Sequence, residues 1–140
     1  MGEVRVKVRL TNASDEALER RGQLSSDKVR TYEADALVDT GADSLILPVF
    51  VMQQLGLMAR NRRVVEYADG RNEPVDVTES LIIKINGRET SDEALVLGDE
   101  VLIGRTVLEK LDLHVDSLNR RLAPNPGIRI SQCQRSNRFR

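Results

Sequence analysis

Apolar and charged residues alternate at the start of the chain and then give way to a more polar stretch. Residues 4–10 (VRVKVRL) have a period of two, which predicts a half-exposed strand. Residues 29–39 predict a second strand that becomes more apolar toward its end. Residues 11–30 break this pattern and could form two short helical turns, with Ser14 as the N-cap and Gly22 as the C-terminal stop.

The rest of the pattern is typical of extended segments and tight turns. SLILP (44–48) continues extended, and the residues after Pro48 predict a short helix that ends near Gly56. Residues 105–113 predict a helix with one apolar face, and RLAP (121–124) predicts a last short strand. Three pairs of turn residues, each between two extended arms, predict β-hairpins: Asp69-Gly70, Asn86-Gly87 and Gly98-Asp99.

These elements predict a single, mostly-β domain over residues 1–123 that contains an insertion at 11–30. The remaining residues, 124–140, are rich in arginine and have no acidic side chain. They are interpreted as a basic, flexible C-terminal tail and not as a nucleic-acid arm.

Composition excludes several classes of function. The 21 basic and 22 acidic residues are interspersed, so no basic field for nucleic acid is expected, and the few aromatic side chains argue against base stacking. No run approaches the roughly 18 apolar residues of a membrane helix, and the N-terminus lacks the apolar block of a signal peptide. We therefore expect a soluble, cytoplasmic protein with no membrane partner. Cys133 and His114 are the only residues of their types, which leaves no ordinary metal site, and no cofactor is expected.

Asp39, Thr40 and Gly41 follow directly on an apolar strand, where a buried carboxylate is costly unless it is paired. One interpretation is a simple Asp turn. A second is a phosphoryl or nucleotide enzyme, which lacks support because no Gly-rich loop opens a helix here. A third is peptide hydrolysis by water activated between two Asp side chains that share one proton. The chain supplies one such Asp, so this chemistry requires a two-fold homodimer.

The segment ALVDTGADSLILP (36–48) resembles the active-site segment of retropepsin-like (retroviral-type) aspartic proteases. The second signature of that family is an apolar-apolar-Gly segment running into a short helix, and VLIGRTVLEKLDL (101–113) resembles it. The resemblance covers residues 4–123 in outline, and the sequence is most similar to the small, stand-alone prokaryotic members of the family. It implies an all-β fold: a single-lobe closed β-barrel or sandwich with a flap hairpin and one short C-terminal helix, forming a two-fold homodimer.

The resemblance also implies roles for individual residues. Asp39 is the expected catalytic acid or base from each subunit, and Thr40 is expected to bond across the two-fold axis to the partner loop. Gly41 permits close backbone approach. An ion pair between Asp43 and the arginine after Gly104, Arg105, is expected to brace the active-site loop.

Ala42 and the first hairpin complete the expected site. Ala42 has no hydroxyl to bond the carboxylate, so the Asp pair is expected to stay half-protonated nearer neutral pH than in pepsin-like enzymes. The hairpin around Asp69 and Gly70 lies where the family has its flap, a lid that closes over substrate. Tyr67 and Ala68 are the further candidates for contact with substrate in this hairpin.

The leading hypothesis is therefore a homodimeric aspartic endopeptidase that acts on extended peptides with apolar side chains beside the cut. The alternative is a catalytically idle dimer of the same fold that binds a protein or peptide. Substitution of Asp39 separates these two hypotheses, and a phosphoryl-transfer enzyme would instead depend on a divalent metal.

Overall fold

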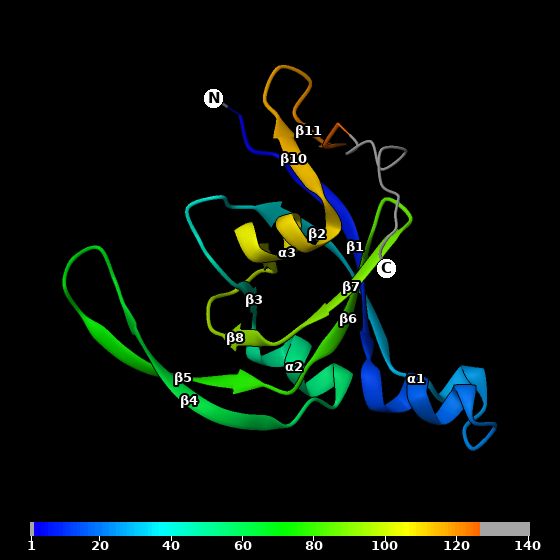
Figure 1. Cartoon of the computed structure of the whole chain (residues 1–140). Coiled ribbons are helices and arrows are strands. Elements are labelled where there is room, and N and C mark those ends of the chain that lie inside the picture. Colours follow the sequence, from blue (N-terminus) through cyan, green and yellow to red (C-terminus); the bar gives the residue numbers. More distant parts are fainter. Residues whose placement is uncertain (1, 127–140) are drawn as a thin grey trace, which may run out of the picture.

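The computed structural model describes residues 2–126, which form a mostly-β domain with short helices (Figure 1). The predicted tail residues 127–140 lie outside the described residues. The strands are β1 (Arg5–Asn12), β2 (Thr31–Val38), β3 (Leu45–Leu47), β4 (Ala59–Glu66), β5 (Asn72–Thr78), β6 (Leu81–Ile85), β7 (Arg88–Asp92), β8 (Ala94–Val96), β9 (Leu102–Ile103), β10 (Leu113–Asp116) and β11 (Arg121–Pro124). The helices are α1 (Ala13–Arg20), α2 (Val49–Leu55), α3 (Arg105–Leu111) and the 3-10 turn η1 (Ser26–Lys28).

Nine strands form one mixed sheet in the order β4-β5-β8-β3-β9-β2-β1-β6-β7. The expected closed barrel is wrong, because β4 and β7 are the two edges of this sheet and are not paired with each other within residues 2–126. A physical reason lies in the edge strands: β4 (ARNRRVVE) is exposed along nearly its whole length and carries three arginines. Charged side chains on an edge strand discourage further pairing.

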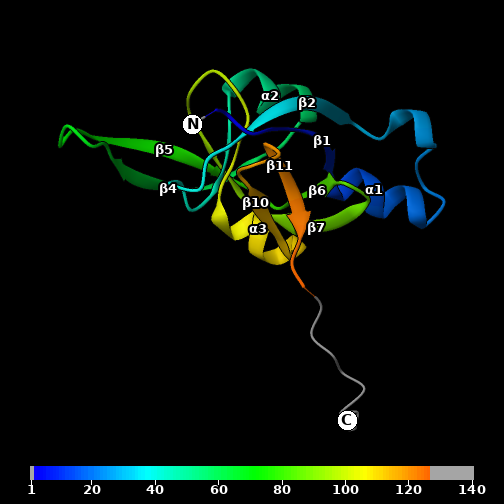
Figure 2. The ribbon, with the colours of Figure 1, turned by 90° about the horizontal axis from the view of Figure 1, so that it is seen from above.

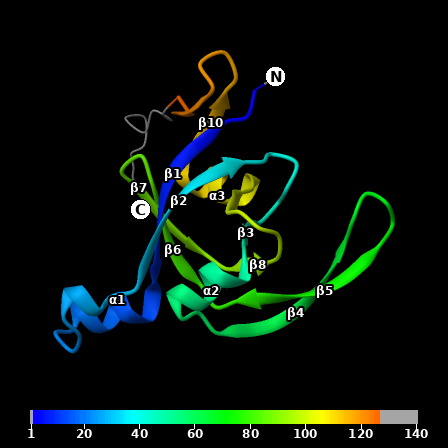
Figure 3. The same cartoon turned by 180° about the vertical axis from the view of Figure 1, so that it is seen from behind.

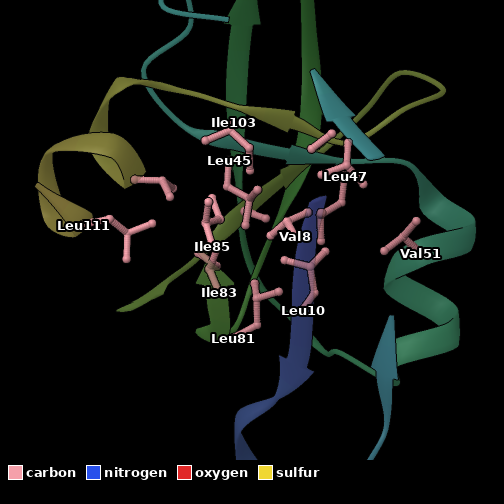
Figure 4. Packing of buried hydrophobic residues seen from close by; sticks show 14 of the residues in the cluster. Val8, Leu10, Leu45, Leu47, Val51, Leu81, Ile83, Ile85, Ile103 and Leu111 are labelled. Atoms are coloured by element: carbon pink, nitrogen blue, oxygen red, sulfur yellow. The ribbon is translucent and has the colours of Figure 1, made fainter. Parts of the chain in front are cut away.

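The core is aliphatic and lies between the curved sheet and helices α2 and α3. Figure 4 shows side chains of β1, β3 and β6 packing together with Val51 of α2 and Leu111 of α3. Leu10, Leu45 and Ile83 have no exposed surface. Burial of each such side chain stabilises the fold by about 1.5–3 kcal/mol. The core therefore fixes the ends of β2, β3 and β9, where the signature segments meet.

The helix boundaries follow from local capping. The Asn12 side chain caps α1 by accepting the Asp15 N–H (2.9 Å), so the expected N-cap at Ser14 is wrong. Helix α2 follows Pro48 and ends at Gly56, as predicted. Helix α3 begins where expected but ends two residues earlier, because Asp112 takes a left-handed conformation and residue 113 starts β10.

Two of the three predicted hairpins are present. The pair at Asn86-Gly87 is a two-residue turn with positive φ at both residues, as the hairpin rule requires. The hairpin at Asp69-Gly70 joins β4 and β5 through a longer loop that the Tyr67 N–H closes on the Arg71 carbonyl (2.8 Å). The hairpin at Gly98-Asp99 is wrong: β8 pairs in parallel with β3, and β9 pairs in parallel with β2.

Three features project from the body. Helix α1 and η1, which form the insertion at 11–30, extend from one end, while the long β4–β5 hairpin arches away from the other side (Figures 1 and 3). Strands β10 and β11 form a separate antiparallel hairpin near the N-terminal residues (Figures 1 and 2). Within residues 2–126, no helix has the length and apolar character needed to cross a membrane.

Candidate active site

Asp39 follows the last residue of β2 and is held by the neighbouring strand β9. The Asp39 N–H donates to the Ile103 carbonyl (2.9 Å), and Val38 is in parallel register with Ile103. One turn-forming segment thus leaves the sheet at Asp39 and another leaves it at Gly104. The pairing of β2 with β9 brings together two signatures that are far apart in the sequence.

The carboxylate of Asp39 takes part in a local turn. The Oδ1 atom accepts the Gly41 N–H (3.0 Å), and the backbone carbonyl oxygen of Asp39 accepts the Ala42 N–H (3.1 Å). A Cβ on residue 41 would lie 3.2 Å from Asp39 Oδ1, so glycine keeps this turn uncrowded. The single chain therefore contains the Asp turn that the sequence also allowed. In one chain Asp39 is half-exposed, and its burial in a dimer stays a prediction.

Gly104 fixes the distance between the two signature segments. A Cβ on residue 104 would overlap the Ser44 carbonyl oxygen and would lie 2.8 Å from the Ala42 carbonyl oxygen. Directly beyond Gly104, the Arg105 N–H donates to the Ala42 carbonyl (2.9 Å) and the Thr106 N–H donates to the Asp43 carbonyl (3.0 Å). The start of α3 thus holds the far side of the Asp39 loop.

The ion pair expected between Asp43 and Arg105 is present. Arg105 Nη2 donates to Asp43 Oδ1, and this contact raises the pKa of the guanidinium further. Both side chains are largely exposed, at 58% for Arg105 and 72% for Asp43. Solvent screens exposed charges, so the backbone hydrogen bonds contribute more to holding the loop than this pair does.

The expected flap residues lie at the tip of the β4–β5 hairpin. Tyr67 Oη donates to Glu73 Oε1 (2.5 Å), which raises the pKa of the Tyr67 phenol, and the Arg71 guanidinium lies 5.0 Å from the centre of the tyrosine ring. Ala68, Asp69 and Gly70 are exposed. Among residues 2–126, no hydrogen bond or ion pair joins this tip to the Asp39 loop.

A hollow of about 400 Å³ opens beside the Asp39 loop. It is lined by Gly2, Glu3, Val4, Leu37, Val38, Asp39, Thr40, Val115 and Ser117. Thr40 is exposed at its rim. Val115 and Ser117 come from the β10–β11 hairpin, and sequence reasoning missed both. The signal available was the alternation of LHVD (113–116), of which only Leu113 falls in the predicted helix.

One carboxylate is available to chemistry in this loop, because Asp43 is paired with Arg105. Over residues 2–126, the structure has no cluster of three or more His, Cys, Asp or Glu side chains that could hold a metal ion. A lone carboxylate with an exposed face can act as a base toward water, but it cannot also supply the acid that a dyad requires.

Comparison with known proteins identifies a family. Residues 27–110 match the family model described as gag-polyprotein putative aspartyl protease, a stretch that includes the first signature segment and residues 101–110 of the second. The solved structure of Simian Foamy Virus (mac) protease is similar, with 17% sequence identity and a TM-score of 0.49 over 76% of this chain and 93% of that chain. No curated protein matches the sequence. The comparisons do not support the expected likeness to prokaryotic, stand-alone members.

Proposed function

The chain belongs to the family of gag-polyprotein aspartyl proteases, and we propose that it is a homodimeric aspartic endopeptidase. Two copies of Asp39, one from each subunit, activate a water molecule for hydrolysis of a peptide bond. The observation that supports this most directly is the Asp39 loop itself. Strand β9 holds one side of the loop and the start of α3 holds the other, while the carboxylate keeps an exposed face.

The two carboxylates share one proton, because like charges about 3 Å apart are not both ionised. The ionised Asp39 takes a proton from water as the water oxygen attacks the peptide carbonyl carbon. The protonated Asp39 of the other subunit donates its proton to the carbonyl oxygen, which gives a neutral tetrahedral intermediate. The intermediate then collapses: the protonated carboxyl gives its proton to the leaving nitrogen as the C–N bond breaks, and a hydroxyl of the intermediate gives a proton to the ionised carboxylate. The products are a carboxyl group and an amine, and the pair again holds one proton.

Each neighbouring residue has a supporting role in this proposal. Thr40, exposed beside Asp39, bonds to the partner loop, and Gly41 leaves room for that approach. Gly104 and the Asp43–Arg105 pair hold the loop in place. Ala42 adds no hydroxyl to the carboxylate, so activity extends toward neutral pH.

The β4–β5 hairpin acts as the lid over substrate. Tyr67, Ala68, Asp69 and Gly70 are the proposed contacts at its tip, and Gly70 has the positive φ that the turn requires (87°). Extended peptides with apolar side chains beside the cut are the proposed substrates, held by strand-like pairing. A cytoplasmic location and the absence of nucleic-acid and membrane partners remain predictions from composition.

A binding module without catalysis is the second candidate. The observation that favours it is the Gly41 N–H bond to Asp39 Oδ1 (3.0 Å), because a half-exposed carboxylate with solvent and a local hydrogen-bond donor is satisfied within one chain. In such a module, Asp39 would be an ordinary turn residue, and its replacement by asparagine would leave peptide binding intact.

A peptide-cleavage assay separates the candidates. Wild type, Asp39→Asn and the control Asp35→Asn, an exposed acid on the same strand, are incubated with a mixed peptide pool between pH 3 and 8 in the presence of EDTA. The protease account predicts cleavage by wild type and Asp35→Asn, with apolar residues at the cut, and at least about a hundredfold less by Asp39→Asn. No cleavage by a wild-type protein that is shown to be dimeric would favour the binding module. Cleavage that appears only in a parallel series without EDTA would favour metal-dependent chemistry.

A further inference from the structure

The hollow beside Asp39 is lined by both apolar and polar residues and opens to solvent. Val4, Leu37, Val38 and Val115 contribute the apolar side chains, and the rim carries Asp39 together with other polar groups. The apolar part of this hollow of about 400 Å³ is an unfavourable feature of a surface, because removing apolar area from water lowers the free energy. The hollow thus favours an apolar occupant.

The β10–β11 hairpin presents a matching side chain. Leu118 in its turn is 95% exposed, more than any other large apolar residue among those described. Its neighbour Ser117 lines the hollow of the same chain, so Leu118 lies at the same end of the molecule as Asp39. Figure 1 shows this hairpin beside the N-terminal residues, some of which also line the hollow.

The turn that carries Leu118 is held in place by polar contacts. Asp116 accepts the Asn119 side-chain N–H (2.8 Å) and its backbone N–H (3.3 Å), and these bonds hold the pKa of the Asp116 carboxyl below its usual value. Arg121 lies 3.6 Å from the same carboxylate. On the other side, the Arg120 guanidinium packs against the backbone of Gly2. Leu118 is therefore displayed on an ordered turn, which reduces the entropy lost when it becomes buried.

The dyad places a second copy against this hollow. Two Asp39 carboxylates about 3 Å apart require the two-fold axis to pass between them. The side of the hollow that Asp39 and Thr40 line then faces the other subunit. Because a two-fold interface is isologous, a side chain that enters the partner's hollow is matched by the reciprocal contact.

We propose that two copies of the chain associate through the β10–β11 hairpin, with Leu118 of each copy seated in the hollow beside Asp39 of the other. This inference rests on the proposed function, since the shared dyad is what brings the second copy to this face. The hairpin contact then joins assembly to catalysis, because the side chains that hold the dimer together lie next to the two carboxylates.

Sedimentation velocity over a range of protein concentrations measures the dimer dissociation constant of the full chain. Leu118→Asp is compared with wild type and with Val49→Asp, a control that replaces another exposed apolar residue by Asp at the start of α2. We expect Leu118→Asp to weaken dimerisation at least tenfold, with Leu118→Met close to wild type and Val49→Asp unchanged. An unchanged dissociation constant for Leu118→Asp would overturn the proposal, as would a wild-type chain that stays monomeric.

Fluorescence tests the burial of residue 118 directly, because the chain has no tryptophan. In Leu118→Trp, emission is expected to shift to the blue as concentration rises through the dimerisation range. The control Met58→Trp, at a position that is 70% exposed, is expected to show no such shift. A Leu118→Trp spectrum that is the same in monomer and dimer shows that this residue stays in solvent and overturns the proposal.

Peptidase activity separates failure of this inference from failure of the proposed function. Leu118→Asp is expected to lose activity at low concentration and to recover it at high concentration, whereas Asp39→Asn recovers at none. Leu118→Asp with full activity and a full dimer would overturn the hairpin contact and leave the dyad standing. Asp39→Asn with wild-type activity would overturn the proposed function, and the dissociation constants would still decide the interface.

Discussion

Gly104 lies directly against the carbonyl oxygen of Ser44, with no room for a side chain between them. This contact joins the segment that follows β9 to the segment that carries Asp39. It explains in steric terms why an apolar pair, then glycine, precedes α3. It also allows the Arg105 N–H to reach the Ala42 carbonyl (2.9 Å), which anchors the Asp39 loop.

Gly104→Ala is therefore expected to destabilise the domain. The carbonyl oxygens of Ser44 and Ala42 are backbone atoms, which cannot move to another rotamer as a side chain can. The added Cβ should therefore lower the free energy of unfolding by about 1–3 kcal/mol, near the upper end of that range. Urea unfolding measures the loss, and activity should fall with it because the Asp39 loop must shift. Wild-type stability in this variant would show that the two segments do not approach as closely as described.

Ala42→Ser tests how the residue after Asp39-Thr40-Gly41 sets the working pH. A hydroxyl at this position can donate to the carboxylate and favour its ionised form. The half-protonated dyad would then exist at lower pH, so the pH–rate profile should move toward acid relative to wild type. Profiles of kcat/KM between pH 3 and 8 measure this, and a shift toward alkaline pH would contradict it.

Asp15 and Arg30 hold the two ends of the insertion together. Asp15 is buried (6% exposed), and its carboxylate accepts the backbone N–H (3.0 Å), Nε (2.8 Å) and Nη2 (3.0 Å) of Arg30. The side-chain hydrogen bonds from Arg30 are the main reason that the pKa of Asp15 is held below its usual value. A lowered pKa in the folded state means that this pair stabilises the fold above the pKa of the unfolded chain and stops doing so as pH falls through the folded value.

Asp15→Asn should accordingly lower the thermal midpoint by several degrees at neutral pH, because the Arg30 charge loses its partner. The difference in thermal midpoint between the variant and wild type should stay constant above about pH 5. It should shrink as the pH falls below the usual pKa of an Asp side chain. Melting curves of both proteins between pH 7 and 2 measure this, with Asp27→Asn as a control in the same insertion. A difference that grows on acidification would contradict the sign of the shift.

Gly56 and Gly70 offer a matched pair of substitutions. Both have positive φ (65° and 87°), so alanine introduces backbone strain at either position. At residue 70 a Cβ would meet open space, whereas at residue 56 it would overlap the Arg30 guanidinium. Gly56→Ala should therefore destabilise the protein more than Gly70→Ala. Equal urea midpoints for the two variants would show that the Arg30 side chain moves aside at no cost.

Local patterns predicted the site better than they predicted the sheet. Asp39-Thr40-Gly41 and the segment ending in Gly104 are short motifs whose chemistry is local, and the structure places them side by side. The turn at Asn86-Gly87 was also predictable, because two residues fix its geometry. The ion pair of Asp43 with Arg105 followed from the resemblance to the family and is present.

Long-range pairing is what the pattern did not predict. The arms around Gly98-Asp99 look like a hairpin, yet each pairs in parallel with a strand far away in the sequence, β8 with β3 and β9 with β2. A period-two pattern contains no information on which partner a strand selects. The expected closure into a barrel came from the resemblance to the family, and the exposed, arginine-bearing edge strand β4 leaves the sheet open. Strand β10 was missed because a left-handed Asp112 ends α3 early.

The central claim is that each active site uses Asp39 from two chains, and mixing experiments test it most directly. Wild type and Asp39→Asn are unfolded and refolded together at fixed total concentration and varied ratio, and peptidase activity is measured. If both carboxylates are needed, activity should fall as the square of the wild-type fraction, so that an equal mixture retains about one quarter. A linear fall to one half would show that each chain acts with its own Asp39 alone, and the dyad account would be contradicted.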